Sequence, residues 1–246
     1  MLDRGLLSDL AARLTRALDL RAAPIGIAFV GGHEASGAPK FSEPAAPPNR
    51  AGRTGSVPAG CVFWMKGQER AFATVAADHA NCSVGSYTHG FLTLAEAATT
   101  DDVAAVLESG WVGQGDVASL PHLTTRPESI VYGPLATMPV DPDVVLVRIV
   151  GAALMILRNA LPDLRIEGKP QCHIIAIALE HDEPAASVGC ALSRTRTGMP
   201  PEEMTCALPA VTLRDTVVRI ESVAELDRAM ARYASADAKR FTRASD

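Results

Sequence analysis

The sequence predicts an α+β fold, a mixed sheet with packed helices, formed as a single domain over residues 1–246. Short apolar runs typical of buried strands and longer amphipathic runs typical of helices are mixed along the chain without a strict βαβ repeat. No internal repeat and no linker of distinct composition divides the sequence. A chain of 246 residues, 48% of them hydrophobic, is long enough to bury one proper core.

The first half of the chain begins with an amphipathic helix at 1–20, whose leucines share one helical face. A Pro-containing apolar run predicts a buried strand at 22–30. After an irregular segment, a helix starts at Cys61 and a strand follows at 71–76. Helices are expected at 92–98 and 99–110, the second with Thr100 or Asp101 as its cap and Gly110 as its stop.

The second half mixes both types of element. We expect strands at 129–136, 141–149, 163–168 and 172–180, and a helix at 150–161 that ends before Pro162. Residues 185–196 are typical of a strand or turn. A proline just inside the start and acids in the first turn predict a short helix at 199–209. A strand at 215–222 and a C-terminal helix at 222–241, with Ser222 and Glu225 as its capping box, complete the chain.

The segment 31–60 has no periodicity and is rich in Gly, Pro, Ala and Ser. A structureless segment of this length inside one domain is typical of a lid, a binding loop or disorder. We therefore expect either a mobile lid beside Cys61 or a disordered insert.

Composition excludes several classes of protein. The net charge is -5 and no group of Lys and Arg alternates with aromatic residues, so nucleic-acid binding is not expected. The N-terminus lacks the pattern of a signal peptide. The longest apolar stretch, 144–157, is too short for a membrane span and is interrupted by Arg148. We expect a cytoplasmic protein with a small-molecule substrate, no membrane partner and, for assembly, a homodimer.

The five cysteines are the residues most suited to chemistry. An odd number of widely spaced cysteines in a chain without export favours reduced thiols over a disulfide framework. Cys82 follows Asn81, a good N-cap residue, and a thiolate in the first turn of a helix is stabilised by the macrodipole. None of the five forms a C-x-x-C pair. Dispersed cysteines can converge in a fold, but buried structural thiols explain the same pattern.

Two histidines and two arginines lie close to these cysteines in the sequence. His79 and His89 flank Cys82, where each could pack or cap, orient a thiolate or bind a metal. Arg194 and Arg196 follow Cys190 on a segment expected to be extended, so both would face one side and could clamp a carboxylate or phosphate. We expect Arg196 to be a surface charge and assign the substrate contact to Arg194.

The order of motifs resembles the uncharacterised ArCR family. The matching segments are APIGIAF, CVFWMKG, NCSVGSYTHG, YGPLA, DPDVVLV, QCHII, GCALSR and CALPA, from about residue 20 to 209. At VRIVGAALMI the chain departs from the family pattern, which has a glutamine there. The resemblance brings no established reaction with it.

What the resemblance implies is a set of corresponding positions. These are Cys61, Cys82, Cys172 and Cys190, together with Arg194, Gly85, Gly90 and Gly189, while Cys206 falls where relatives often lack a cysteine. Four cysteines embedded in motifs favour a metal centre, and a [4Fe–4S] cluster suits four thiolates, or three with an open iron. Zinc bound by four thiolates, or by cysteine and His79, is the alternative metal.

Three hypotheses follow. The first is an iron–sulfur enzyme acting on a small anionic substrate, with the four cysteines as ligands, His79 as a second-shell or acid/base group and Arg194 holding the anion. The second is a haem- or other cofactor-binding protein that uses His79, His89 or Cys82 as axial ligand. The third is a metal-free enzyme with Cys82 as its nucleophile, activated by a helix N-terminus and His79.

Overall fold

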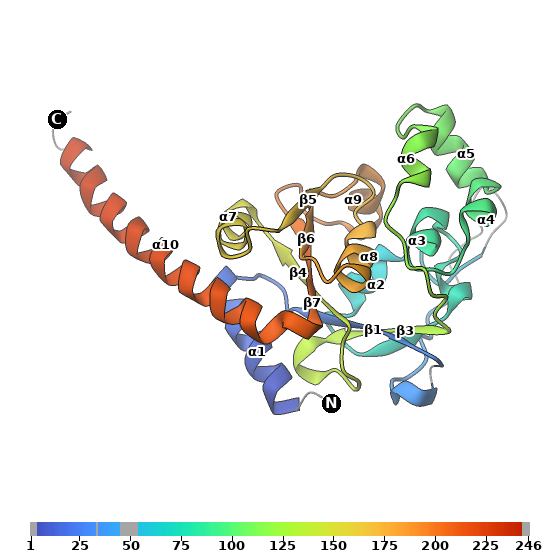
Figure 1. Cartoon of the computed structure of the whole chain (residues 1–246), viewed down its shortest axis with the longest axis horizontal. Coiled ribbons are helices and arrows are strands. Elements are labelled where there is room, and N and C mark those ends of the chain that lie inside the picture. The colour runs from blue at the N-terminus through green and yellow to red at the C-terminus, as the bar shows by residue number, and fades with distance from the viewer. Residues whose placement is uncertain (1–3, 33, 45–53, 243–246) are drawn as a thin grey trace.

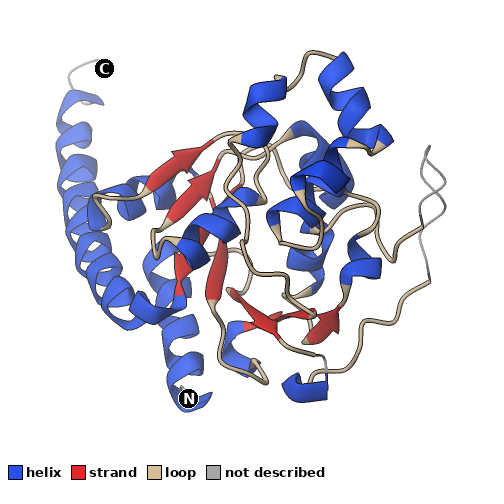
Figure 2. Cartoon of the chain, turned by 45° about the vertical axis from the view of Figure 1, so that its right-hand side comes forward, coloured by secondary structure: helices blue, strands red, loops and turns tan. Residues whose placement is uncertain are grey.

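Seven strands form one mixed sheet in the order β2-β3-β1-β4-β7-β6-β5 (Figures 1 and 2). The computed structural model describes residues 4–32, 34–44 and 54–242 of the chain. The strands are β1 (Ile25–Val30), β2 (Phe72–Thr74), β3 (Ser129–Pro134), β4 (Val144–Ile149), β5 (Arg165–Glu167), β6 (Ala185–Ser187) and β7 (Met204–Pro209). Neighbouring strands are antiparallel except β5 and β6, which are parallel. The predicted α+β class with a mixed sheet and packed helices is confirmed.

Helices cover both faces of this sheet. They are α1 (Arg4–Leu18), α2 (Cys61–Lys66), α3 (Ser83–Thr88), α4 (Leu94–Ala98), α5 (Asp101–Glu108), α6 (Gln114–Ala118), α7 (Gly151–Ala160), α8 (His173–Glu180), α9 (Ala191–Thr197) and α10 (Leu213–Thr242). Because side chains alternate across each strand, the sheet supplies two separate cores.

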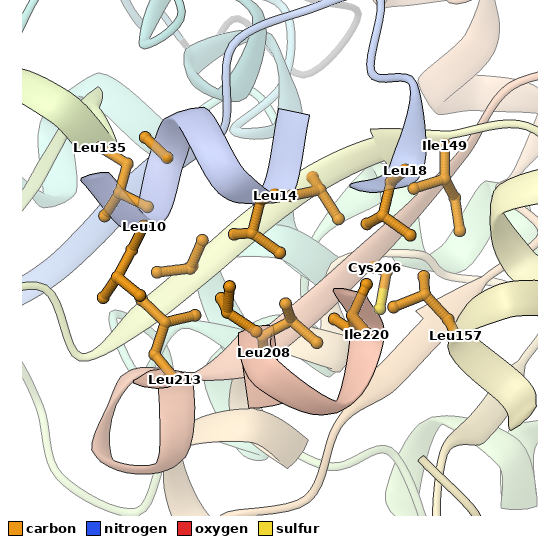
Figure 3. Close-up of a cluster of buried hydrophobic side chains, with 14 of the residues drawn as sticks. Leu10, Leu14, Leu18, Leu135, Ile149, Leu157, Cys206, Leu208, Leu213 and Ile220 are labelled. Atoms are coloured by element: carbon orange, nitrogen blue, oxygen red, sulfur yellow. The ribbon is translucent and has the colours of Figure 1, made fainter. Parts of the chain in front are cut away.

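The first core lies between the sheet and α1, α7 and α10 (Figure 3). The leucines that predict the N-terminal helix supply its centre, because Leu7, Leu10 and Leu14 are buried on one face of α1. On the outer side, Arg13 of α1 donates from Nε to Glu221 of α10 at 2.9 Å. This contact joins the first described helix to the first part of the last one.

The second core lies on the opposite face, beneath α2 and α8. Strand residues such as Ile27 and Tyr132 pack here against Phe63 of α2 and Ile174 of α8. Cys61 and Cys172 belong to this core, whereas Cys206 of β7 belongs to the first. The pleat of the sheet therefore separates Cys206 from the other thiols.

Several expected elements are of the wrong type. The run 172–180 forms helix α8 and not a strand, because its residues are buried nearly all round and the apolar pattern then has no periodicity to read. Residues 204–209 form strand β7 and not the end of a helix. Residues 215–222 continue α10 and are not a strand, so Ser222 lies inside that helix and does not cap it. Tertiary packing overrides the local preference in each case.

The irregular segment at 31–60 falls partly outside the described residues. Within those described, Phe41, Val57 and Ala59 are buried in the second core. The Phe41 amide donates to the Ala73 carbonyl at 2.8 Å, and the Ala73 amide donates to the Pro39 carbonyl at 2.9 Å. These stretches are therefore packed parts of the fold, and residues 33 and 45–53, on which the rest of the expected lid or disordered insert falls, lie outside the described residues.

The first core gives a stability prediction. Leu14 is fully buried between α1 and the sheet, so we expect Leu14→Ala to lower the free energy of unfolding by about 3 kcal/mol through lost burial and a residual cavity. Val211→Ala, at a side chain that is 76% exposed, is the control and should change it by less than about 0.5 kcal/mol. Urea denaturation measures both, and equal effects would contradict the assignment of this core.

Candidate functional site

Four of the five cysteines lie at helix N-termini on the second-core side of the sheet. Cys61 is the first residue of α2, while Cys82, Cys172 and Cys190 are the N-caps of α3, α8 and α9. The Cys82 sulfur accepts from the Gly85 amide at 3.4 Å, and the Cys190 sulfur accepts from the Ser193 amide at 3.3 Å. We call Cys61, Cys82, Cys172 and Cys190 the thiol cluster.

Each pair of thiols in this cluster is close enough to interact electrostatically. Burial raises the pKa of Cys61 to about 12, and the neighbouring Cys82 and Cys190 contribute to the rise. Burial also raises the pKa of Cys82, with a contribution from Cys190. Burial raises the pKa of Cys172 well above its ordinary value, and there the other three thiols all contribute. The fold thus brings these thiols close enough for the charge on one to affect the pKa of Cys61, Cys82 and Cys172.

Cys206 takes no part in this arrangement. Burial alone raises its pKa to about 12, and no neighbouring thiol contributes. It lies between Leu157, Ile220 and the other apolar side chains of the first core (Figure 3). Cys206 is a packed core thiol and gives an internal reference for the other four.

Ser193, a residue that the sequence did not single out, interacts with Cys61, with Cys190 and with the residue before Cys172. A hydrogen bond from its hydroxyl group acts to lower the pKa of Cys61, and its amide donates to Cys190. The same hydroxyl oxygen accepts from Gln171 Nε2 at 2.5 Å, and Gln171 directly precedes Cys172. No motif rule marks a serine three residues after a cysteine, so only the folded contacts reveal this role.

Arg194 and Arg196 do not share one side, as an extended segment would require. They lie on helix α9, where residues two apart point about 200° away from each other, so they cannot form a clamp on one side. The Arg194 guanidinium donates to the carbonyls of Val188, Pro200 and Glu203 at 2.7, 2.6 and 2.8 Å, which holds the chain around α9. Arg196 is the cation that acts to lower the pKa of Cys61 and of Cys82.

His79 and His89 are buried neutral imidazoles beside the cluster. The Thr74 hydroxyl donates its hydrogen to the Ile130 carbonyl at 3.1 Å. Its oxygen lies 3.0 Å from His79 Nε2 and can only accept there, so Nε2 carries the proton. His89 Nδ1 lies 2.7 Å from the Gly85 carbonyl and therefore donates to it. Burial lowers the pKa of His79 well below 6.5 and that of His89 to about 4.

This state limits what His79 can do. A histidine that stays neutral at physiological pH is a poor general acid, and its second nitrogen, Nδ1, finds no hydrogen-bond partner among the described residues. Gly60 packs closely on this nitrogen, because a Cβ atom at Gly60 would lie only 3.0 Å from it. His79 also contacts the rings of Phe63 and Phe91, with centroids 4.8 and 4.9 Å away. The geometry favours a packing role that positions Gly60 and hence Cys61.

Tyr132 places an unpaired hydroxyl next to the cluster. Its side chain is fully buried, and its oxygen has no hydrogen-bond partner among the described residues. Burial raises its pKa, and the thiols of Cys61 and Cys172 contribute to the rise. A buried hydroxyl without a partner costs free energy, so this group is poised to donate a hydrogen bond to something bound between the thiols.

Helices α4, α5 and α6 form a lobe attached to two of the cysteine-bearing elements (Figure 1). The Asp102 carboxylate of α5 accepts from the amide and hydroxyl of Ser83 at 2.9 and 2.8 Å, directly after Cys82. Lys169, three residues before Cys172, lies over the Trp111 ring at 4.4 Å. The lobe is therefore coupled to the positions of Cys82 and Cys172.

Two features are absent from the described residues. In the described ranges, no group of three or more His, Cys, Asp or Glu side chains is arranged to hold a metal ion. Nor does any helix in the same ranges combine the length and apolar character that crossing a membrane requires.

The fold defines an α+β protein in which four cysteines lie at helix N-termini. The chain belongs to the family described as uncharacterised ArCR, whose family model matches residues 13–219. This match spans all four cysteines of the cluster. No curated protein and no solved structure matches the chain significantly.

The buried histidines give a pH prediction. Between pH 6.5 and 4 the unfolded chain takes up protons on His79 and His89 that the folded chain excludes, so the free energy of unfolding falls as pH falls. Each histidine contributes up to about 1.4 kcal/mol per pH unit. Urea denaturation of His89→Gln should show a shallower dependence by about that amount, while His181→Gln, at an exposed side chain, should match the wild type. Equal slopes in all three proteins would rule this out.

Proposed function

We propose that this protein binds a [4Fe–4S] cluster through Cys61, Cys82, Cys172 and Cys190 and uses it on a small anionic substrate. The supporting observation is that every pair of these four thiols interacts electrostatically, while the fifth cysteine is on the other side of the sheet. Four separate helices deliver one thiol each to one place, which packing alone does not require.

The raised pKa values couple metal binding to proton release. Without metal the thiols of Cys61, Cys82 and Cys172 stay protonated, because burial and the neighbouring thiols raise their pKa. Binding of iron would release these protons and stabilise the thiolates by attraction to the metal.

A cluster fits the arrangement better than one zinc ion. Tetrahedral zinc with Zn–S bonds of about 2.3 Å brings its sulfurs to about 3.8 Å from one another. Among the described residues, no group of three or more His, Cys, Asp or Glu side chains is arranged to hold a metal ion. In a [4Fe–4S] cluster each thiolate binds a different iron, so the sulfurs stand further apart.

The surroundings supply what such a centre needs. Tyr132 has a free hydroxyl hydrogen beside Cys61 and Cys172, and hydrogen bonds to cluster sulfurs are one of the means by which proteins set its potential. Amide groups already point at the sulfurs of Cys82 and Cys190. When bound, the cluster would supply electron transfer or, with one iron open, a Lewis-acidic position for substrate.

Arg196 supports the anionic substrate. It is partly exposed, and its positive charge favours the thiolates of Cys61 and Cys82. Cys82 and Cys190 are less buried than Cys61 and Cys172, so this is the side on which solvent reaches the cluster. A carboxylate or phosphate arriving there would meet a guanidinium group.

The cysteines give the direct test of the cluster. We expect anaerobically prepared protein to be brown and to contain about four irons and four sulfides per chain. Alanine at any one of the four positions should lower iron and sulfide content, most for the buried Cys61 and Cys172. Cys206→Ala is the matched control and should retain the full content. A colourless wild-type protein without iron or sulfide, or equal loss in the control, would overturn the proposal.

Arg196 tests the anion separately. In the iron-loaded protein, Arg196→Gln should retain iron and sulfide but bind inorganic phosphate or acetate at least about tenfold more weakly, since one charge-assisted contact is lost. Titration calorimetry measures this, with Arg228→Gln on the exposed part of α10 as the control. Unchanged binding in Arg196→Gln would remove the anion from the proposal and leave the cluster untouched.

The haem alternative has less support. His79 Nδ1 and His89 Nε2 are the free ring nitrogens, but both histidines are at most 1% exposed. Gly60 lies against the first nitrogen, and aromatic rings cover the faces of both imidazoles. A macrocycle could enter only if the second core separated from the sheet.

The nucleophile alternative also has less support. A reactive cysteine needs a lowered pKa, and that of Cys82 is raised by burial in spite of the Gly85 amide and Arg196. The neutral His79 hydrogen-bonds Thr74 instead of Cys82. The helix N-terminus expected at Cys82 is formed, but the expected pairing with His79 is not.

A further inference from the structure

The C-terminal half of α10 projects from the body of the protein (Figure 1). The last buried residue of this helix is Ala224, and from Glu225 to Arg240 every side chain is exposed or partly exposed. That stretch is about 24 Å long at about 1.5 Å per residue. An isolated helix of this length is marginal in water, so a stable one needs a surface to pack against.

One face of the projecting helix is apolar. Leu226, Met230 and Tyr233 are 66%, 61% and 66% exposed. They continue a line along the helix in which successive positions are alternately four and three residues apart, the spacing of a coiled-coil contact. We call this line the α10 seam: Arg219, Val223, Leu226, Met230, Tyr233 and Asp237. The side of α10 that packs on the body carries Val217, Ile220 and Ala224, and Val223 at the start of the seam is partly buried against the same core.

The seam is complementary to itself in one orientation. Its first residue, Arg219, is basic, its last residue, Asp237, is acidic, and four apolar residues lie between. Consider two copies that run antiparallel, related by an axis that crosses the seam midway between Leu226 and Met230. Leu226 then faces Met230 of the second copy, and Val223 faces Tyr233. Arg219 then faces Asp237 at both ends. A parallel pair would place Arg219 against Arg219 and Asp237 against Asp237, which costs free energy.

The end charges and the apolar pairs between them are matched together only in this antiparallel register. We propose that the chain forms a homodimer through an antiparallel pair of α10 helices that contact along the α10 seam. This interface lies outside the thiol cluster and does not depend on the proposed cofactor.

The first test is the oligomeric state of the full chain. Analytical ultracentrifugation should give twice the chain mass for the wild type. Leu226→Glu and Met230→Glu should each raise the dimer dissociation constant at least about tenfold, because a charge replaces an apolar contact. Met155→Glu, at a methionine of α7 that is 48% exposed, is the matched control and should remain dimeric. A monomeric wild type, or dimers that both seam variants leave intact, would overturn the proposal.

A charge exchange tests the orientation. Arg219→Asp and Asp237→Arg should each weaken the dimer, since each places like charges opposite one another in the antiparallel pair. The double variant restores opposite charges and should recover the wild-type dissociation constant within about threefold. In a parallel pair each single change only replaces one like-charge contact with another and weakens nothing. No recovery in the double variant would overturn the antiparallel arrangement.

Discussion

The burial of both faces of the central sheet is the constraint on which the rest of this structure depends. Alternating strand residues supply one core beneath α1, α7 and α10 and another beneath α2 and α8. The helices of the second face begin where strands and loops enter that core, so their N-termini and the cysteines at them meet there. The separation of Cys206 from the other thiols follows from the same alternation.

The thiol cluster is a costly arrangement for a chain without a ligand. Burial and the neighbouring thiols raise the pKa of Cys61 and Cys172, and the hydroxyl of Tyr132 is left without a partner among the described residues. Natural proteins keep few such groups, and those they keep are often functional. A positively charged centre bound by the thiols would relieve both costs. Arg196, Ser193 and the neutral histidines are then the surroundings of that centre.

The two faces of the sheet carry different features, the thiol cluster on one and α10 on the other. The second face holds the thiols and the α4–α6 lobe, which Asp102 and Lys169 attach next to Cys82 and Cys172. The first face anchors α10, whose exposed half carries the α10 seam. Dimerisation and the chemistry of the thiols would thus be carried by opposite sides of one sheet.

The sequence by itself determined the α+β class, the amphipathic α1, strands β1, β3 and β4, and the position of Cys82 at a helix start, because periodicity and capping are local properties. It failed for α8 and β7, whose apolar runs lack a readable period, and it placed Arg194 and Arg196 on one side of an extended segment where the structure has a helix. Only the tertiary structure brought Cys61, Cys82, Cys172 and Cys190 together and set Arg196 and Tyr132 beside them. Their convergence depends on contacts between residues far apart in the chain, which no local pattern encodes.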